Sequence, residues 1–437
     1  MLQEQKGFVP IFILLMILIA GATGTFLYKI NKGEIKTASL AELPIPQSIK
    51  ENFPINPENP QKAEEKPQQD SNTPILVPTP GQSSTPTPTP TPNSTAKTTP
   101  TPTPTQATTS VKASTITKKV LAVIYNPVLK SGKKLHEEAG WNDPIAQTSA
   151  VVNSVEKSSS GVVDFEIEFA ERDEWPPTIN KPRHTEDSYK KCRGIFSESN
   201  TTDCESGVHA DYAQIWSEQN LCSRISSGAI DAVFLYGPAY AGWDEFAYKI
   251  PGNKFPYNAP SNYWLYYGRN YNIPDCNNKT IYVLGWIYQR GTAEALHSFG
   301  HWIETALAMT VGRGAWDATC STSGDFNKFT CINKDLKSSS PATVANCGNV
   351  HYPPNGTSDY NYANTNEVKH TCDSYLNYPA TGSTKEENCS AWGCNQQGYL
   401  EWWMYRIPRL SGATDGNLKN WWKYVVDFDN AVVEAKK

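Results

Sequence analysis

The chain has 437 residues, with 39 lysines and arginines against 44 aspartates and glutamates, for a formal net charge of −5. This mild negative charge argues against a nucleic-acid-binding protein, because such proteins gather positive charge against the phosphates. All ten cysteines lie between Cys192 and Cys394. An even number confined to one region predicts up to five disulfides in an oxidising compartment, and the alternative is a set of buried, reduced thiols.

The chain begins with an apolar run from Gly7 to Leu27, which is long enough to cross a bilayer as a helix. We expect a short cytoplasmic segment over 1–6 and a transmembrane signal anchor over 7–28. Lysines flank the run on both sides and leave its orientation ambiguous, so the cysteines decide it. They predict a single-pass protein of the cell membrane whose C-terminal domain is extracellular.

The start of the chain, Gln5-Lys-Gly-Phe-Val-Pro10, also resembles the anchor segment of type IV pilins. In that family a basic residue and a glycine precede Phe and a long apolar helix. The family's glutamate at the fifth mature position is replaced here by Phe12, and Pro10 is not typical. An uncleaved signal anchor therefore fits this segment better.

Residues 29–114 contain little that can form a core, and 85–105 is dominated by Thr-Pro repeats. Proline at alternate positions removes backbone donors and favours extended polyproline II. The composition predicts a disordered, Pro/Thr-rich stalk that holds the following domain away from the membrane.

The folded part is expected over 115–437, where strand-like and helix-like patterns alternate. The β-α-β-α-β-β-α order predicts an α/β (or α+β) fold with a mixed β-sheet and packed helices. Predicted strands cover 119–126, 162–169, 231–236 and 280–287, and predicted helices cover 143–158 and 211–227, with two more near 396–405 and 417–428. Between them, 313–395 carries six of the ten cysteines and predicts a long, disulfide-rich excursion that forms a functional surface.

The segment after the last predicted strand carries four polar side chains that fall on one narrow arc of a helix: Glu294, His297, His301 and Glu304. Leu296, Phe299, Ile303 and Leu307 share the opposite side and are expected to pack on the sheet. Two imidazoles one turn apart can hold a divalent metal, and flanking carboxylates can complete its shell or handle protons. The alternative is a solvent-facing or hydrogen-bonded histidine pair without metal.

The sequence His297-Ser-Phe-Gly-His301 resembles the zinc-binding helix of the zincin metallopeptidases, which also follows a mixed sheet. The resemblance implies that both histidines bind zinc and that a third ligand, a glutamate or histidine, lies further along the chain. It covers about ten residues. Ser298 stands where that family has its catalytic glutamate, so the resemblance implies a metal site more readily than a peptidase. Glu294, one turn before His297, is the candidate displaced base.

Two residues are candidates for the third ligand. Glu304 lies on the same arc of the helix, and His351 lies in the Pro- and Gly-containing segment 347–356, where a rigid loop suits coordination. Asp359, His370 and Asp373 are weaker candidates from the same excursion.

These residues predict a metal-dependent hydrolase, with zinc as cofactor, that acts on peptide or glycan at the cell surface. The alternative is a non-catalytic carbohydrate-binding or adhesion domain. Aromatic residues mixed with Asn and Asp in 257–267 and 359–364 favour that alternative, because sugar rings stack on such surfaces. The same rings are also typical of a disulfide-stapled core.

Overall fold

The computed structural model describes residues 25–29, 35–39, 111–179, 181–192, 209–251, 272–313, 324–331 and 344–436. The chain divides into two compact units, Met1–Pro100 and Thr101–Lys437. In the first unit, β1 (Thr25–Lys29) pairs antiparallel with β2 (Ile35–Ser39). Residues 25–28 of the expected anchor are therefore strand, and its remainder lies outside the described residues. No helix among the described residues is long and apolar enough to cross a membrane.

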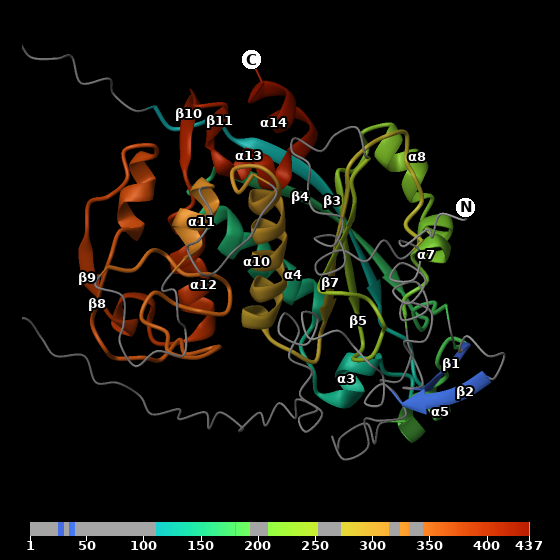
Figure 1. Cartoon of the computed structure of the whole chain (residues 1–437). Coiled ribbons are helices and arrows are strands. Elements are labelled where there is room, and N and C mark those ends of the chain that lie inside the picture. Colours follow the sequence, from blue (N-terminus) through green and yellow to red (C-terminus); the bar gives the residue numbers. More distant parts are fainter. Residues whose placement is uncertain are drawn as a thin grey trace, which may run out of the picture. The chain divides into compact units, whose positions relative to one another are not determined.

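The second unit contains a mixed sheet of five strands in the order β4-β3-β5-β7-β6, which confirms the predicted α/β class (Figure 1). The strands are β3 (Ile116–Tyr125), β4 (Val163–Arg172), β5 (Ala232–Gly237), β6 (Phe246–Lys249) and β7 (Ile281–Ile287). Four of them run parallel, and β6 pairs antiparallel with β7. The sequence patterns did not predict β6, because it has only four residues.

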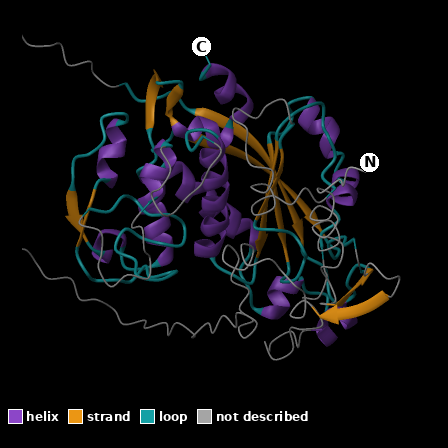
Figure 2. Cartoon of the chain, in the orientation of Figure 1, coloured by secondary structure: helices purple, strands orange, loops and turns teal. Residues whose placement is uncertain are grey.

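Helices cover both faces of the sheet (Figure 2). One face packs on α7 (Tyr212–Glu218) and α8 (Leu221–Ser226), and the other on α4 (Pro144–Ser158) and α10 (Thr292–Met309). Outside α10 lie α12 (Gln396–Tyr405) and α13 (Trp421–Val426), which both contact it. The remaining described elements are α3 (Leu135–Ala139), α5 (Glu186–Cys192), α11 (Asp325–Thr330), α14 (Phe428–Glu434), β8 (Val368–His370), β9 (Lys385–Glu387), β10 (Arg409–Thr414), β11 (Asn417–Asn420) and 3-10 turns at Cys372–Asn377 and Cys389–Trp392.

Local chemistry explains where these helices begin and end. The Asp143 side chain accepts the first backbone N–H groups of α4, and Pro144 occupies its first position, as predicted. The single helix predicted over 211–227 is two helices, because Asn220 adopts a left-handed backbone with φ 51° between them. The helix predicted over 417–428 is also wrong in part, since β11 occupies its first four residues.

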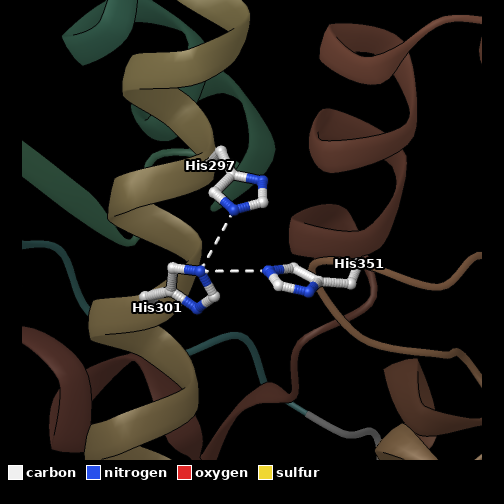
Figure 3. A group of neighbouring side chains, drawn as sticks. All are labelled: His297, His301 and His351. Atoms are coloured by element: carbon white, nitrogen blue, oxygen red, sulfur yellow. Dashed lines mark hydrogen bonds between the residues drawn. The ribbon is translucent and has the colours of Figure 1, made fainter. Parts of the chain in front are cut away.

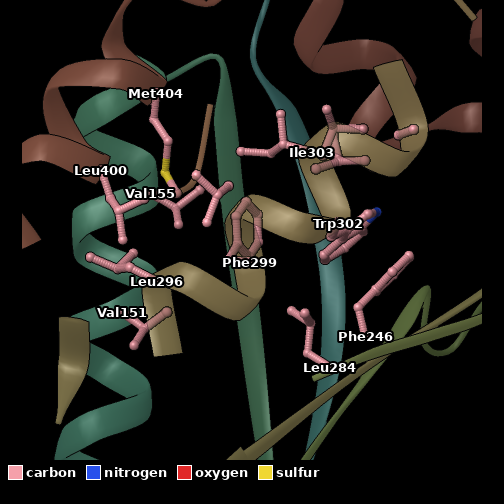
Figure 4. Packing of buried hydrophobic residues seen from close by; sticks show 14 of the residues in the cluster. Val151, Val155, Phe246, Leu284, Leu296, Phe299, Trp302, Ile303, Leu400 and Met404 are labelled. Atoms are coloured by element: carbon pink, nitrogen blue, oxygen red, sulfur yellow. The ribbon is translucent and has the colours of Figure 1, made fainter. Parts of the chain in front are cut away.

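Helix α10 is buried on nearly all sides rather than on one. Phe299 meets Phe165 of β4 edge to face, and Trp302 stacks on Phe246 of β6. Leu296 lies between α4 and α12 (Figure 4). The predicted polar arc is covered as well, because the exposed fraction of His297 is 7% and that of Glu304 is 2%. A helix in this setting can hold side chains in fixed positions for chemistry.

Disulfides pin the segment that lies beside α10. Cys347 bonds Cys372, and Cys389 bonds Cys394, both within the predicted disulfide-rich excursion. A third bond links Cys222 to Cys276, Cys331 is also disulfide-bonded, and no cysteine in the described part of the chain is free. The predicted oxidation of the cysteines is therefore confirmed for the described ones.

The described contacts of the second unit begin slightly before the expected boundary at 115. Lys112 forms an antiparallel bridge with Leu410, and the Ser411 N–H donates to the Val111 carbonyl at 2.9 Å. The chain entering β3 is therefore held against β10 from residue 111 onwards.

Candidate metal centre

Three histidines from two separate segments converge on one point (Figure 3). His297 and His301 stand one turn apart on α10, and His351 comes from the loop that follows Cys347. The His301 Nε2 atom lies 3.1 Å from Nε2 of His297 and 3.3 Å from Nε2 of His351. Two nitrogens bound tetrahedrally to one zinc at about 2.0–2.1 Å are separated by about 3.3–3.4 Å. The observed spacing is therefore close to the one that a single ion requires.

Each of these imidazoles has an oxygen-bearing side chain at its other nitrogen. His301 Nδ1 lies 2.9 Å from Glu304 Oε2, and His351 Nδ1 lies 3.6 Å from Asp359 Oδ1. His297 Nδ1 lies 3.4 Å from Gln396 Nε2, and exchanging the nitrogen and oxygen of that amide places an acceptor at the same point.

A carboxylate only accepts hydrogen bonds, so Glu304 places the proton of a neutral His301 on Nδ1 and directs the Nε2 lone pair into the cluster. Metal-binding histidines are typically oriented in this way by a partner at the second nitrogen.

Glu304 also connects α10 to the loop that carries His351. Its Oε1 accepts the Val350 N–H at 2.9 Å, while its Oε2 faces His301. Both oxygens of this buried carboxylate are thus occupied by protein donors. The structure places Glu304 behind His301, on the side away from the converging nitrogens, although the sequence predicted it as a ligand.

A glycine in the middle of α10 lets the His351 loop come close. A Cβ at Gly300 would lie 2.5 Å from Val350 Cγ2, and Val350 is fully buried. Any larger residue at this position must displace the Val350 side chain, which is next to His351 in the loop. This requirement explains a glycine at a helix position where it costs about 1 kcal/mol relative to alanine.

Helix α12 and the disulfide fix the other side of the same loop. The Trp403 Nε1–H donates to the Gly348 carbonyl at 3.0 Å, and the Tyr399 hydroxyl lies 2.8 Å from the Asn349 carbonyl. The Cys347–Cys372 bond anchors the start of the loop. These contacts fix the backbone on both sides of His351.

Burial and charge set different proton affinities for the three rings. Burial, with the neighbouring His301 and His351, lowers the pKa of His297 to about 2, and burial likewise lowers the pKa of His351. Burial also opposes the charged form of His301, but the hydrogen bond and charge of Glu304 outweigh it and raise the pKa of His301. At neutral pH His297 and His351 are therefore neutral, as metal binding requires.

The predicted catalytic residue Glu294 lies at the start of α10 and caps it. Its Oε2 accepts the Gly291 N–H at 3.0 Å, which closes the first turn. Ser298, at the position of the zincin glutamate, is buried, and its hydroxyl donates to the Glu294 carbonyl at 3.3 Å. Glu294 therefore directs its carboxylate to the start of the helix and not to the three histidines, and Ser298 has no carboxylate.

The structure adds three residues that the sequence did not single out for this site. Glu245 Oε2 lies 3.6 Å from His301 Nε2, the Gln396 amide faces His297, and the Tyr360 ring lies 4.9 Å from the His351 ring. Tyr360 and Gln396 follow from the folding of distant segments onto α10. No local pattern marks Glu245, which precedes β6.

The weaker candidates separate into two groups. Asp359 joins the cluster beside His351, whereas His370 and Asp373 belong to another network, in which His370 faces Glu387 at 3.2 Å and Asp373 binds Arg406 at 2.7 Å. Of the two aromatic segments, 257–267 lies outside the described residues.

The three histidines lie close enough together to hold one metal ion. Comparison of the chain with protein-family models, with curated proteins and with solved structures found no match in any of the three.

Proposed function

We propose that this protein is a metal-dependent hydrolase whose centre is one divalent ion, best matched by Zn²⁺, held by His297, His301 and His351. The observation that carries the proposal is the convergence of three Nε2 atoms while each Nδ1 faces Glu304, Asp359 or Gln396. A histidine pair on a solvent-exposed helix face does not require a polar partner at each Nδ1 atom. Imidazole ligands favour zinc and other transition metals over Ca²⁺ or Mg²⁺.

Three protein ligands are typical of catalytic zinc sites, whereas structural sites use four. When bound, such an ion supplies a polarised water of lowered pKa and a Lewis acid for a carbonyl or glycosidic oxygen. The His351 side chain is 34% exposed, and Tyr360 beside it is 55% exposed, so one side of the centre is open to solvent. A substrate can approach from that side, which supports a catalytic role over a structural one.

The substrate class that we propose is peptide or glycan at the cell surface. The apolar run at the start of the chain and the disulfides of the second unit support a membrane-anchored protein with an extracellular domain. The exposed Tyr360 ring favours the alternative, a non-catalytic carbohydrate-binding domain.

The test is metal analysis of the purified full chain, together with His297→Ala and His351→Ala variants. We expect about one zinc per chain for the wild type. Either variant should lose most of its zinc, because all three histidines are needed to hold the ion. Cleavage of a peptide library or of cell-wall glycan should require the metal. A chain that binds no added zinc contradicts the proposal, and metal-independent glycan binding would support the alternative.

A further inference from the structure

We infer that Glu245 is the catalytic proton acceptor of this centre, supplied by the segment before β6 instead of by α10. The inference rests on the proposed metal site and deepens it. Glu245 Oε2 lies 3.6 Å from Nε2 of His301, the nitrogen that faces the other two histidines. Glu304 occupies the opposite nitrogen of the same ring. The two carboxylates therefore stand on the two sides of His301, one behind it and one on the metal side.

Glu245 lies on the solvent-exposed side of the site, next to His301. Its side chain is 52% exposed, whereas that of Glu304 is 2% exposed. An oxygen in the fourth position of a tetrahedral site lies about 3.3 Å from each ligand nitrogen. A carboxylate at a similar distance from His301 Nε2 is suited to bond to a water there.

The other carboxylates near the described histidines have different tasks. Glu304 holds His301 and Val350 through its two oxygens, and Glu294 caps α10 at Gly291. Asp359 lies at the Nδ1 side of His351. Glu245 is the carboxylate in the described part of the chain whose oxygen approaches a converging nitrogen. Ser298 stands where the zincin metallopeptidases have their catalytic glutamate and has no carboxylate. In this proposal Glu245 supplies that carboxylate.

The backbone beneath Glu245 is fixed on the sheet. The Glu245 carbonyl accepts the Gly285 N–H of β7 at 3.1 Å, and Trp243 Nε1–H donates to the Trp286 carbonyl at 3.2 Å. A Cβ at Gly285 would overlap the Asp244 carbonyl and the Trp243 ring. Because Gly285 has no side chain, the segment 243–245 can pack directly against the backbone of β7. An exposed side chain on such a fixed backbone is positioned for catalysis without being buried.

With an amide substrate, the reaction is an ordinary hydrolysis. Glu245 accepts one proton from the water, whose oxygen forms a bond to the carbonyl carbon. The carbon–nitrogen bond then breaks, and the proton passes from Glu245 to the leaving nitrogen. The products are a carboxylic acid and an amine, and Glu245 returns to the carboxylate form.

The test uses Co²⁺ in the full-length protein, with acetohydroxamate and azide as probes read from the visible spectrum. The free probe at neutral pH is acetohydroxamic acid, which gives up a proton when it binds a metal as acetohydroxamate, and the base beside the ion takes that proton, whereas azide brings no proton. Glu245→Gln keeps the size of the side chain and removes the proton acceptor. Glu386→Gln, on an exposed residue of β9, is the control for the loss of one negative charge.

We expect that Glu245→Gln still binds one Co²⁺ per chain and binds acetohydroxamate about ten- to a hundredfold more weakly, the value of one hydrogen bond to a charged group. Azide affinity should stay equal or rise, because a negative charge has been removed. Unchanged acetohydroxamate affinity, or an equal loss for both probes, overturns the inference. Loss of stoichiometric Co²⁺ overturns it too, since Glu245 would then be a ligand. A wild type that binds no Co²⁺ instead contradicts the proposed centre itself.

Discussion

The approach of Gly300 to Val350 gives the sharpest test of how the third histidine is positioned. In Gly300→Ala the new Cβ would lie 2.5 Å from Val350 Cγ2 and 3.5 Å from Cγ1. Alanine in a helix interior gains about 1 kcal/mol over glycine. Forcing a methyl group into a packed contact costs about 1–3 kcal/mol. The free energy of unfolding of the metal-free protein should therefore fall by about 0–2 kcal/mol, from the difference of these two terms.

The effect on metal binding should be larger, because the group that must move is next to His351. Displacement of a ligand or its supporting shell typically costs about ten- to a hundredfold in metal affinity. Isothermal titration with Zn²⁺ measures this loss, and thermal melting measures the stability. Val350→Ala in the same chain removes the methyl groups that the new Cβ meets, so the double variant should regain most of the metal affinity. If Gly300→Ala melts at a higher temperature and binds zinc as tightly as the wild type, Gly300 is not needed to position His351.

Three further predictions follow from the same contacts. Glu304→Gln should weaken zinc binding about ten- to a hundredfold in a titration, because the amide no longer orients His301 as a carboxylate does; unchanged affinity would mean that Glu304 has no role in the site. Replacing Cys347 and Cys372 together with alanine should lower the free energy of unfolding in a denaturant titration by about 3.5 kcal/mol, since their bond closes a segment with a sequence separation of 25; a change near zero would contradict this. The raised pKa of His301 means that its proton competes with metal below that pKa, while His297, with a pKa of about 2, is already neutral. Zinc affinity should therefore fall about tenfold per pH unit below the His301 pKa. In the same pH range, calorimetry in two buffers should show about one proton released per zinc bound, and release of three would mean that all three histidines are protonated before zinc binds.

The sequence predicted those parts of the fold in which local chemistry and final structure agree. Asp143 and Pro144 start α4 where the cap and the fixed proline φ require it, and the predicted strands of the parallel sheet are all present. The break at Asn220 was not predictable, because a left-handed residue inside a helix-like pattern depends on packing. The short strand β6 depends on its pairing with β7 in the same way.

For the candidate site, helical periodicity placed His297 and His301 together, and loop composition selected His351. What periodicity cannot supply is the direction of each side chain. Glu304 shares the arc with the histidines, yet it turns to Val350 on a loop that lies beyond the reach of any local pattern. Glu245 is brought to the site only by the pairing of β6 with β7. The direction of Glu304 and the approach of Glu245 are therefore found from the structure alone.

The most direct test of the three-histidine centre is zinc-edge X-ray absorption of the zinc-loaded full chain, compared with His351→Ala. A zinc ion held by the three histidines should show a first shell of nitrogen and oxygen at about 2.0–2.1 Å, with the outer scattering of three imidazoles. His351→Ala, if loaded at high zinc, should show one imidazole fewer. A shell that contains sulfur, or an imidazole count that is the same in both proteins, would contradict the three-histidine centre.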